Sequence, residues 1–200
     1  YAHIPLIHGA DGAKLSKRHG ALAVEAYRDM GLLPEAMRNY LLRLGWSHGD
    51  EEIIPTAKAI EWFDLDHVGR SPSRFDMVKM TNLNAHYLRE AEDVRLVALV
   101  CERLQAQGLA VDEAAQARIL RGMNGLKQRA KTLIDLSESA SFYAKKRPLR
   151  FDEKAAKMLA GEGRSRLASV KAALTAPGAT WSAATLEGAV RDTATASGAK

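Results

Sequence analysis

Helical periodicity runs through most of this 200-residue sequence and restricts its fold more than any other feature. In segment 33–45, Pro34 stands at the first helical position and Glu35 in the first turn. The apolar side chains of this segment recur along one helix face, which we expect to be buried: Met37, Tyr40, Leu41 and Leu44. We expect Gly45 to cap the C-terminus of this helix. Further helix starts are predicted at Thr56, Asp76, Glu92, Asp112, Gly125, Asp152 and Ser182, and helix stops at Gly108, Gly122 and Gly161. The sequence shows no comparable series of alternating strands, so it predicts a mainly α fold.

The first residues depart from the helical pattern. Residues 1–7 form a short apolar run that enters the glycine-containing stretch 9–12, which predicts a strand followed by a loop. Pro5 indicates that this strand is short or lies at an edge. No partner strand is visible in the sequence. We therefore interpret the run as the last strand of a domain whose earlier part lies outside these residues.

Composition excludes several classes of protein. The hydrophobic fraction of 46% and the charged fraction of 26% are those of a soluble globular protein. The longest apolar stretches, such as 96–101, fall short of the roughly 20 residues that cross a bilayer. We expect a cytoplasmic protein without a membrane partner. Cys101 lies at helical spacing from Val97 and Leu104, which favours a buried hydrophobic role over a nucleophilic one. The six histidines lack ligand spacing, so no metal site is predicted in this chain.

Positive charge is concentrated in one part of the chain. Between Arg118 and Arg150, nine basic residues stand against two acidic ones, a net charge of +7, whereas the remaining residues carry −2. Such a segment favours a polyanionic partner, with nucleic acid first and a membrane surface second. Within it, Pro148 interrupts the helical pattern, and we interpret residues 145–150 as a connection between domains.

The stretch 14–18, with the sequence KLSKR, carries the most chemical information. It places three cations around the hydroxyl of Ser16, directly after the predicted strand and loop. Lysine ammonium groups beside the α-phosphate of a nucleotide would neutralise the charge that develops when a carboxylate attacks it. In an isolated pentapeptide, a solvated basic turn would be the better interpretation, because such runs occur by chance.

The context of this stretch carries a family resemblance. Residues 3–21, HIPLIHGADGAKLSKRHGA, are followed at 24–52 by VEAYRDMGLLPEAMRNYLLRLGWSHGDEE, and together they resemble the bacterial glutamyl-tRNA synthetases of class I. KLSKR would be the local form of the KMSKS signature of that class. The resemblance continues through Trp62-Phe63, Phe75-Asp76-Met77 and 79–88, and weakens beyond about residue 90.

The resemblance implies a domain order and an activity. Residues 1–22 would end a Rossmann-type catalytic domain, 23–90 would form a stem-contact domain, and 91–146 and 147–200 would form two all-helical anticodon-binding subdomains, the second incomplete. The complete protein would be a monomeric glutamate–tRNA ligase that uses ATP and Mg²⁺ to convert L-glutamate to glutamyl-adenylate and then charges tRNA(Glu). The family's other catalytic signature, His-Ile-Gly-His, is not found in this sequence. We therefore expect the isolated 200 residues to be inactive.

The resemblance also implies site residues. Lys14, Ser16 and Lys17 would be catalytic, and Lys14, Lys17 and Arg18 would bind ATP, with Lys17 nearest the α-phosphate. Arg18 replaces the terminal serine of the general signature. Arg129 matches the anticodon-reading arginine of the family, on a helix expected over 126–133. The other tRNA contacts implied are Arg38, Arg43, Lys127, Lys131, Lys145, Lys146 and Arg147. Arg38, Asn39 and Arg43 lie off the apolar stripe of their helix, and a solvated face is the alternative for them.

Two other functions stay open at this point. The chain could be a non-catalytic tRNA-binding module related to the synthetases, or a helical protein-interaction domain. KLSKR favours the enzyme, because a binding module needs no loop that closes on phosphates. The glutaminyl-tRNA synthetases have a largely β anticodon-binding region, whereas helical periodicity continues here to the end. The sequence does not distinguish an enzyme that charges tRNA(Glu) alone from one that also charges tRNA(Gln).

Overall fold

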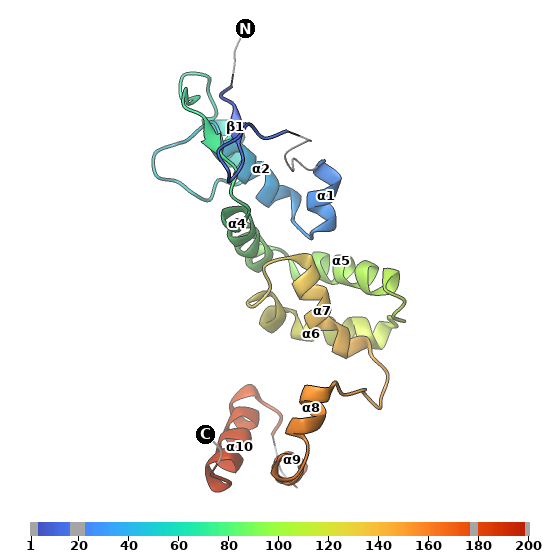
Figure 1. The fold of residues 1–200 in the computed structure, drawn as a ribbon. Helices are drawn as coiled ribbons and strands as arrows, with labels where there is room; N and C mark the ends of the chain where they lie inside the picture. The colour runs from blue at the N-terminus through green and yellow to red at the C-terminus, as the bar shows by residue number, and fades with distance from the viewer. Residues whose placement is uncertain (1–3, 17–22, 177–179, 199–200) are drawn as a thin grey trace. The chain divides into compact units, whose positions relative to one another are not determined.

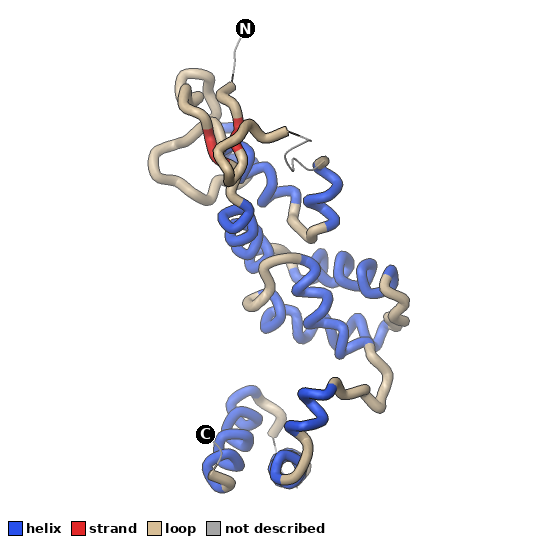
Figure 2. Tube along the Cα trace, viewed as in Figure 1, coloured by secondary structure: helices blue, strands red, loops and turns tan. Residues whose placement is uncertain are grey.

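The computed structural model describes residues 4–16, 23–176 and 180–198, and the described part is mainly helical, as the sequence predicts (Figures 1 and 2). Two compact units, Tyr1–Lys145 and Lys146–Lys200, follow one another along the chain. The first unit contains β1 (Ile7–His8), α1 (Val24–Asp29), α2 (Pro34–Arg43), α3 (Thr56–Trp62), β2 (Ser73–Arg74), α4 (Met77–Glu90), α5 (Asp93–Ala106), α6 (Glu113–Lys127) and α7 (Leu133–Ala144). The second contains α8 (Glu153–Met158), α9 (Glu162–Leu174) and α10 (Ala183–Ala196).

The strand β1 has a partner within this chain. It pairs in parallel with β2, and Ile7 lies opposite Ser73 while His8 lies opposite Arg74. The sequence showed no partner because a two-residue strand has no room for the alternation of apolar and polar residues that marks longer strands. The strand is short, as Pro5 indicated.

Most helix starts agree with the predicted capping residues. Four of them have a side-chain oxygen that accepts a hydrogen bond from a backbone N–H of the first turn: Asp76, Asp112, Asp152 and Ser182. The predictions at Gly122 and Gly125 were wrong, because α6 continues through both. The next helix, α7, follows a capping box in which the Thr132 hydroxyl accepts from the Asp135 N–H and the Asp135 carboxylate accepts from the Thr132 N–H.

Two hydrophobic clusters form the core of the first unit. The larger lies among α2, α4, α5, α6 and α7, and its fully buried residues include Leu33, Leu88, Leu96, Leu104, Ile119 and Leu136. The smaller is built around Tyr27, Tyr40 and Met80. Cys101 packs at the edge of the larger cluster, and burial raises the pKa of its thiol. The predicted hydrophobic packing of this cysteine is confirmed, although its side chain is half-buried and not fully buried as expected.

The helix α2 begins at Pro34, as predicted, but its buried face differs from the expected one. Tyr40 is buried, and Met37 and Leu44 pack against the smaller cluster. Leu41, however, is 47% exposed, so its assignment to the core was wrong. The C-cap is Leu44, one residue before the predicted glycine.

Asn39 was expected on the outer face of α2, but it is only 2% exposed. Its amide accepts hydrogen bonds from the Ile54 N–H at 2.8 Å and the Tyr87 hydroxyl at 2.8 Å, and donates to the Glu52 carbonyl at 3.2 Å. This side chain therefore attaches the loop after α2 to the helix, and it is not available to a partner.

In the second unit, α9 packs against α10. None of the described residues of α8, α9 and α10 is fully buried. Among the described residues of the whole chain, no helix combines the length and the apolar character that a bilayer crossing requires.

Candidate phosphate-binding loop and basic surface

A tight turn over residues 9–13 places Lys14. The Gly9 N–H donates to the Ala13 carbonyl at 2.8 Å, and the Gly12 N–H donates to the Gly9 carbonyl at 3.0 Å. The Asp11 carboxylate accepts from the Ala13 N–H at 3.0 Å. Gly12 has a φ of +79°, a conformation that favours glycine. The turn therefore delivers the chain into KLSKR in a defined direction.

The start of KLSKR is attached to the β1–β2 pair. The Leu15 N–H donates to the Ile7 carbonyl at 2.8 Å, and Lys14 forms an antiparallel bridge with His8. The Lys14 side chain is exposed and Ser16 is half-buried. The predictions for Lys17 and Arg18 fall outside the described residues.

The chain after β2 connects this loop to the helices. The Phe75 N–H donates to the His8 carbonyl at 2.8 Å, which extends the strand pairing by one bond. Asp76 caps α4, and its own N–H donates to the Tyr40 hydroxyl at 2.5 Å. Hydrogen bonds thus join β1, which precedes the loop, to the residues that begin α4, and join these residues to α2.

Arg129 and Lys131 lie in the turn between α6 and α7, not on a helix as predicted. Both side chains are exposed, and the Lys131 ammonium donates to the Asn82 amide oxygen at 3.4 Å. The backbone of the turn is held by the buried Asn84, whose amide donates to the Lys131 carbonyl at 2.7 Å and accepts from the Leu33 N–H at 2.7 Å. The turn is therefore anchored while its cations face outward.

Lys127 has a partner within the protein. Its ammonium lies 2.7 Å from the Asp93 carboxylate and donates to the Ala91 carbonyl at 3.1 Å, and its side chain is only 13% exposed. The pair holds the end of α6 against the start of α5. Because this ammonium is engaged within the protein, the predicted contact of Lys127 with RNA is disfavoured.

The remaining predicted RNA contacts are exposed. The Arg38 guanidinium donates to the Thr56 hydroxyl at 3.1 Å, and the Arg43 guanidinium lies 3.4 Å from the Glu52 carboxylate. Three exposed cations stand in the chain where the two units divide: Lys145, Lys146 and Arg147.

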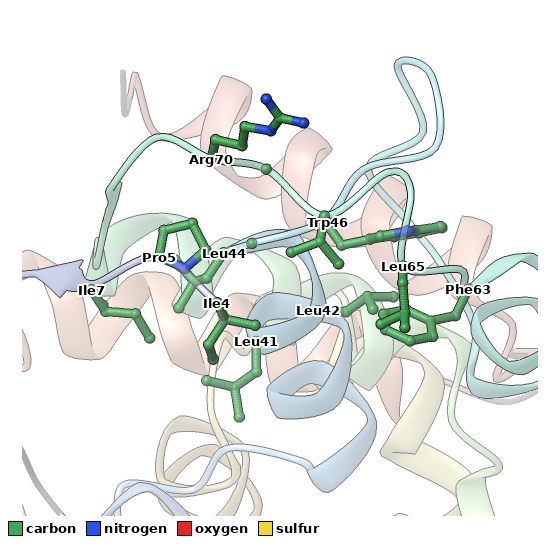
Figure 3. A pocket seen from close by; sticks show the side chains of 13 residues that line it. Ile4, Pro5, Ile7, Leu41, Leu42, Leu44, Trp46, Phe63, Leu65 and Arg70 are labelled. Carbon is green, nitrogen blue, oxygen red and sulfur yellow. The ribbon is translucent and has the colours of Figure 1, made fainter. Parts of the chain in front are cut away.

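An apolar pocket of about 510 Å³ lies next to β1 (Figure 3). Residues before and in β1, including Ile4 and Ile7, face Leu41 of α2 and Phe63 after α3. Among the described residues of its lining, Arg70 is the only charged one, and in Figure 3 its guanidinium points away from the apolar groups. The described part of the lining therefore offers a nucleotide phosphate a single cation.

The described part of the chain contains no set of side chains that could bind a metal ion. There, no group of three or more His, Cys, Asp or Glu side chains is arranged to hold a metal ion. Mg²⁺ is commonly held by one or two carboxylates together with substrate phosphates. The described residues therefore do not form a protein cage for Mg²⁺.

Comparison with known sequence families divides the chain into two matched parts. Residues 1–82 match the family described as tRNA synthetases class I (E and Q), catalytic domain. Residues 85–200 match the family described as anticodon binding domain. The two matches adjoin within α4, the helix that follows the β1–β2 pair.

Individual relatives match the chain over its full length. It is 60% identical over 202 residues to glutamate–tRNA ligase 2 of Paramagnetospirillum magneticum and 54% identical over 201 residues to glutamate–tRNA ligase 2 of Rhodospirillum centenum. All of this chain is covered in both alignments, but only 42% and 43% of the relatives. The chain therefore spans about two fifths of the length of the curated relatives that it matches.

A solved structure shares the fold. The crystal structure of a glutamate tRNA ligase from Elizabethkingia meningosepticum in complex with its amino acid matches with a TM-score of 0.73 and 27% identity, and covers 100% of this chain and 42% of that one. The family matches and the solved structure point to the same family, and the mainly helical fold is consistent with it. The chain belongs to the glutamyl-tRNA synthetases of class I, of which it carries the end of the catalytic domain and an anticodon-binding domain.

Proposed function

We propose that this chain is part of a glutamate–tRNA ligase that activates L-glutamate with ATP and transfers it to tRNA(Glu). The observation that carries the proposal is the match of the whole chain to glutamate–tRNA ligases, with the first residues of KLSKR, 14–16, directly after the turn that leaves β1. The alternative, a tRNA-binding module without catalysis, has no need of a basic loop beside a catalytic-domain strand. We propose that the complete protein acts as a monomer in the cytoplasm.

In this proposal, KLSKR binds the phosphates of ATP. Lys14, Lys17 and Arg18 supply positive charge, and Ser16 supplies a hydroxyl donor. When the glutamate carboxylate attacks the α-phosphorus, the new acyl–phosphate bond forms as the bond to pyrophosphate breaks. Negative charge then builds up on the phosphate oxygens, and a preorganised ammonium group stabilises that charge. Mg²⁺ would enter with the ATP phosphates and neutralise part of their charge.

The helical part would bind tRNA(Glu). Arg129 is exposed in its turn, and the planar fork of its guanidinium suits the edge of a base. Four further exposed cations would contact phosphates: Lys131, Lys145, Lys146 and Arg147. Arg38 and Arg43 are exposed on α2 and would face the inside of the tRNA. The net charge of +7 over 118–150 supports a polyanionic ligand for this region.

The loop is tested by Lys17→Ala in the complete enzyme. We expect adenylate formation to slow by about 10²–10³-fold, the scale for losing one preorganised donor to developing charge. The affinity for tRNA should change little, because the loop acts on ATP. Glutamate-dependent ATP–pyrophosphate exchange and tRNA binding are the two measurements, and Lys58→Ala, an exposed lysine on α3, is the control. Equal losses in both assays would contradict the proposed role of Lys17.

A further inference from the structure

A buried side chain on α4 joins two turns of the first unit. Asn84 lies between the two family matches and is 0% exposed. Its amide oxygen accepts from the Leu33 N–H at 2.7 Å, and its amino group donates to the Lys131 carbonyl at 2.7 Å and the Gly31 carbonyl at 3.4 Å. One side chain thus hydrogen-bonds the backbone of the turn between α1 and α2 and the backbone of the turn between α6 and α7.

These two turns also contact each other directly. The Leu133 N–H, at the start of α7, donates to the Gly31 carbonyl at 2.9 Å and so gains a partner that the helix itself cannot provide. Gly31 has a φ of +82°, and a Cβ there would lie 2.8 Å from the Leu133 nitrogen and 2.9 Å from the Ile134 nitrogen. The close approach therefore requires glycine. The α1–α2 turn forms a fixed support for the end of the α6–α7 turn.

Arg129 stands on the supported turn, two residues before Lys131. Its side chain is exposed, and its N–H donates to the Leu126 carbonyl at 3.2 Å, at the end of α6. On the α7 side, the Asp135 carboxylate accepts from the Lys131 N–H at 3.0 Å. The turn is thus held to α6 and α7 at its ends, and Asn84 ties its backbone to α4.

The hydrogen bonds of Asn84 need an amide at this position. A neutral amide carries an acceptor and two donors on one planar group. Leucine has nearly the same shape but neither donor nor acceptor. Asn84→Leu would therefore release the Lys131 carbonyl from α4, and the backbone that carries Arg129 would lose this constraint.

We propose that Asn84 is a positioning residue for anticodon reading: it holds the Lys131 carbonyl against the α1–α2 turn and thereby fixes where the Arg129 guanidinium meets a base. Asn84 is buried and does not touch the RNA itself. The inference rests on the proposed reading of an anticodon base by Arg129. A contact that reads a base must be held within about 0.5 Å, so its supporting bonds affect selectivity as well as stability. The alternative is an amide that only satisfies buried backbone groups.

The experiment measures the charging efficiency, kcat/KM, of the complete enzyme on tRNA(Glu) and on a variant tRNA that differs only at the third anticodon base. A loss of folded enzyme lowers both efficiencies by the same factor, so their ratio reports discrimination and not stability. Asn84→Leu should reduce this ratio about five- to tenfold, a part of the discrimination that one bidentate base contact supplies. Asn84→Ser should reduce the ratio in the same direction with a smaller loss of stability, because its short hydroxyl cannot reach both turns.

Asn39→Leu is the matched control. Asn39 is 2% exposed and also makes three hydrogen bonds, but its partners are Glu52, Ile54 and Tyr87, outside the α6–α7 turn. This variant makes the same chemical change at an equally buried amide. It should lower the thermal midpoint and keep the ratio within twofold of the wild type.

A double variant, Asn84→Leu with Arg129→Gln, tests whether Asn84 acts through Arg129. In that case the double variant discriminates no worse than Arg129→Gln alone. If Arg129→Gln lowers the ratio but Asn84→Leu and Asn84→Ser keep it within twofold, the positioning inference is overturned while the proposed role of Arg129 stands. If Arg129→Gln keeps the ratio, the proposed reading is overturned and the inference with it. If Asn39→Leu lowers the ratio as much as Asn84→Leu, the effect follows stability alone and the inference is wrong.

Discussion

Arg129 and Lys145 are both exposed cations of the basic segment, yet they should act differently on tRNA. In the complete enzyme, Arg129→Gln should cost about 1–3 kcal/mol in charging and relax selectivity at one anticodon position, because glutamine lacks the charged fork. Lys145→Gln should weaken all tRNAs alike and flatten the salt slope. Charging efficiency on tRNA(Glu) variants that differ only at the third anticodon base measures the difference. If Arg129→Gln leaves the discrimination between anticodon bases unchanged, Arg129 does not read the base, and Lys131 becomes the next candidate.

Lys14 and Ser16 come from the motif, because the chemistry of KLSKR depends on a contiguous run, and their roles stay predictions. On α2, residue types placed some side chains correctly and others on the wrong face. The sequence placed Asn39 on the outer face of α2 and Leu41 on the buried face, whereas the structure buries Asn39 and exposes Leu41. A helical period tells which residues share a face, but not that a loop from 52 to 54 will cover Asn39 and hydrogen-bond its amide. That information arises only from tertiary contacts.

The helix α6 contains two glycines that offer a matched test of packing. A methyl group at Gly125 would meet nothing within 4 Å, whereas one at Gly122 would lie 2.7 Å from the Cζ of Tyr143 on α7. Gly125→Ala should therefore stabilise the chain by up to about 1 kcal/mol through helix propensity. Gly122→Ala gains the same propensity but must displace the tyrosine ring, at a cost of about 1–3 kcal/mol. Urea unfolding measures both; equal stabilities would show that Tyr143 moves aside freely.

The pairing of Glu35 with Arg95 links α2 to α5 through two hydrogen bonds, of 2.5 and 3.2 Å. Burial acts to raise the pKa of Glu35, but the hydrogen bond and charge of Arg95 bring the pKa below its ordinary value of 4.5. A lowered pKa in the folded state contributes stability above the unfolded pKa, and this contribution is lost as the pH falls through the folded value. The stability advantage of the wild type over Glu35→Gln should therefore shrink below about pH 4.5. An advantage that stays constant between pH 7 and pH 3.5 in urea unfolding would contradict this.

Most helix starts were predictable, including those at Pro34, Thr56 and Glu92, which have no side-chain cap. Asp76, Asp112, Asp152 and Ser182 stand directly before apolar periodic segments, and the helices begin there. The capping box of α7 was missed because a glycine inside α6 was interpreted as a helix start. Gly122 was interpreted as a stop, although its role is to admit the Tyr143 side chain from α7. A glycine that serves packing between helices cannot be told from a glycine that ends a helix by local sequence.

At the scale of the whole molecule, the pairing of residues 7–8 with 73–74 joins two segments that lie far apart in the sequence. No local sequence pattern predicts a contact between segments so far apart. The assignment of the first residues to a catalytic domain therefore depended on the family resemblance. The helical part, in contrast, follows from contacts between elements close in sequence, since α5 packs on α6 and α6 on α7. Its class was therefore predictable without a relative.

We predict that the 200-residue chain binds tRNA(Glu) in a salt-dependent manner but does not catalyse glutamate-dependent pyrophosphate exchange. The basic segment supplies phosphate contacts, whereas a single loop of cations offers nothing to bind adenine, ribose and glutamate. Filter binding at increasing salt and an exchange assay with labelled pyrophosphate measure the two properties. Exchange above background would contradict the prediction, and binding that is independent of salt would favour a protein-interaction domain.

The buried amide of Asn84 has a consequence for how this family can change in length. It donates to the carbonyls of Gly31 and Lys131, and the Leu133 N–H donates to the same Gly31 carbonyl at 2.9 Å. An insertion or deletion between Lys131 and Leu133 would separate these partners and leave buried polar groups unsatisfied. Residues 128–129 carry no such bond to α4, so length variation should be tolerated there. Homologues with different tRNA preferences are expected to vary the turn on its α6 side and to keep its α7 side constant in length.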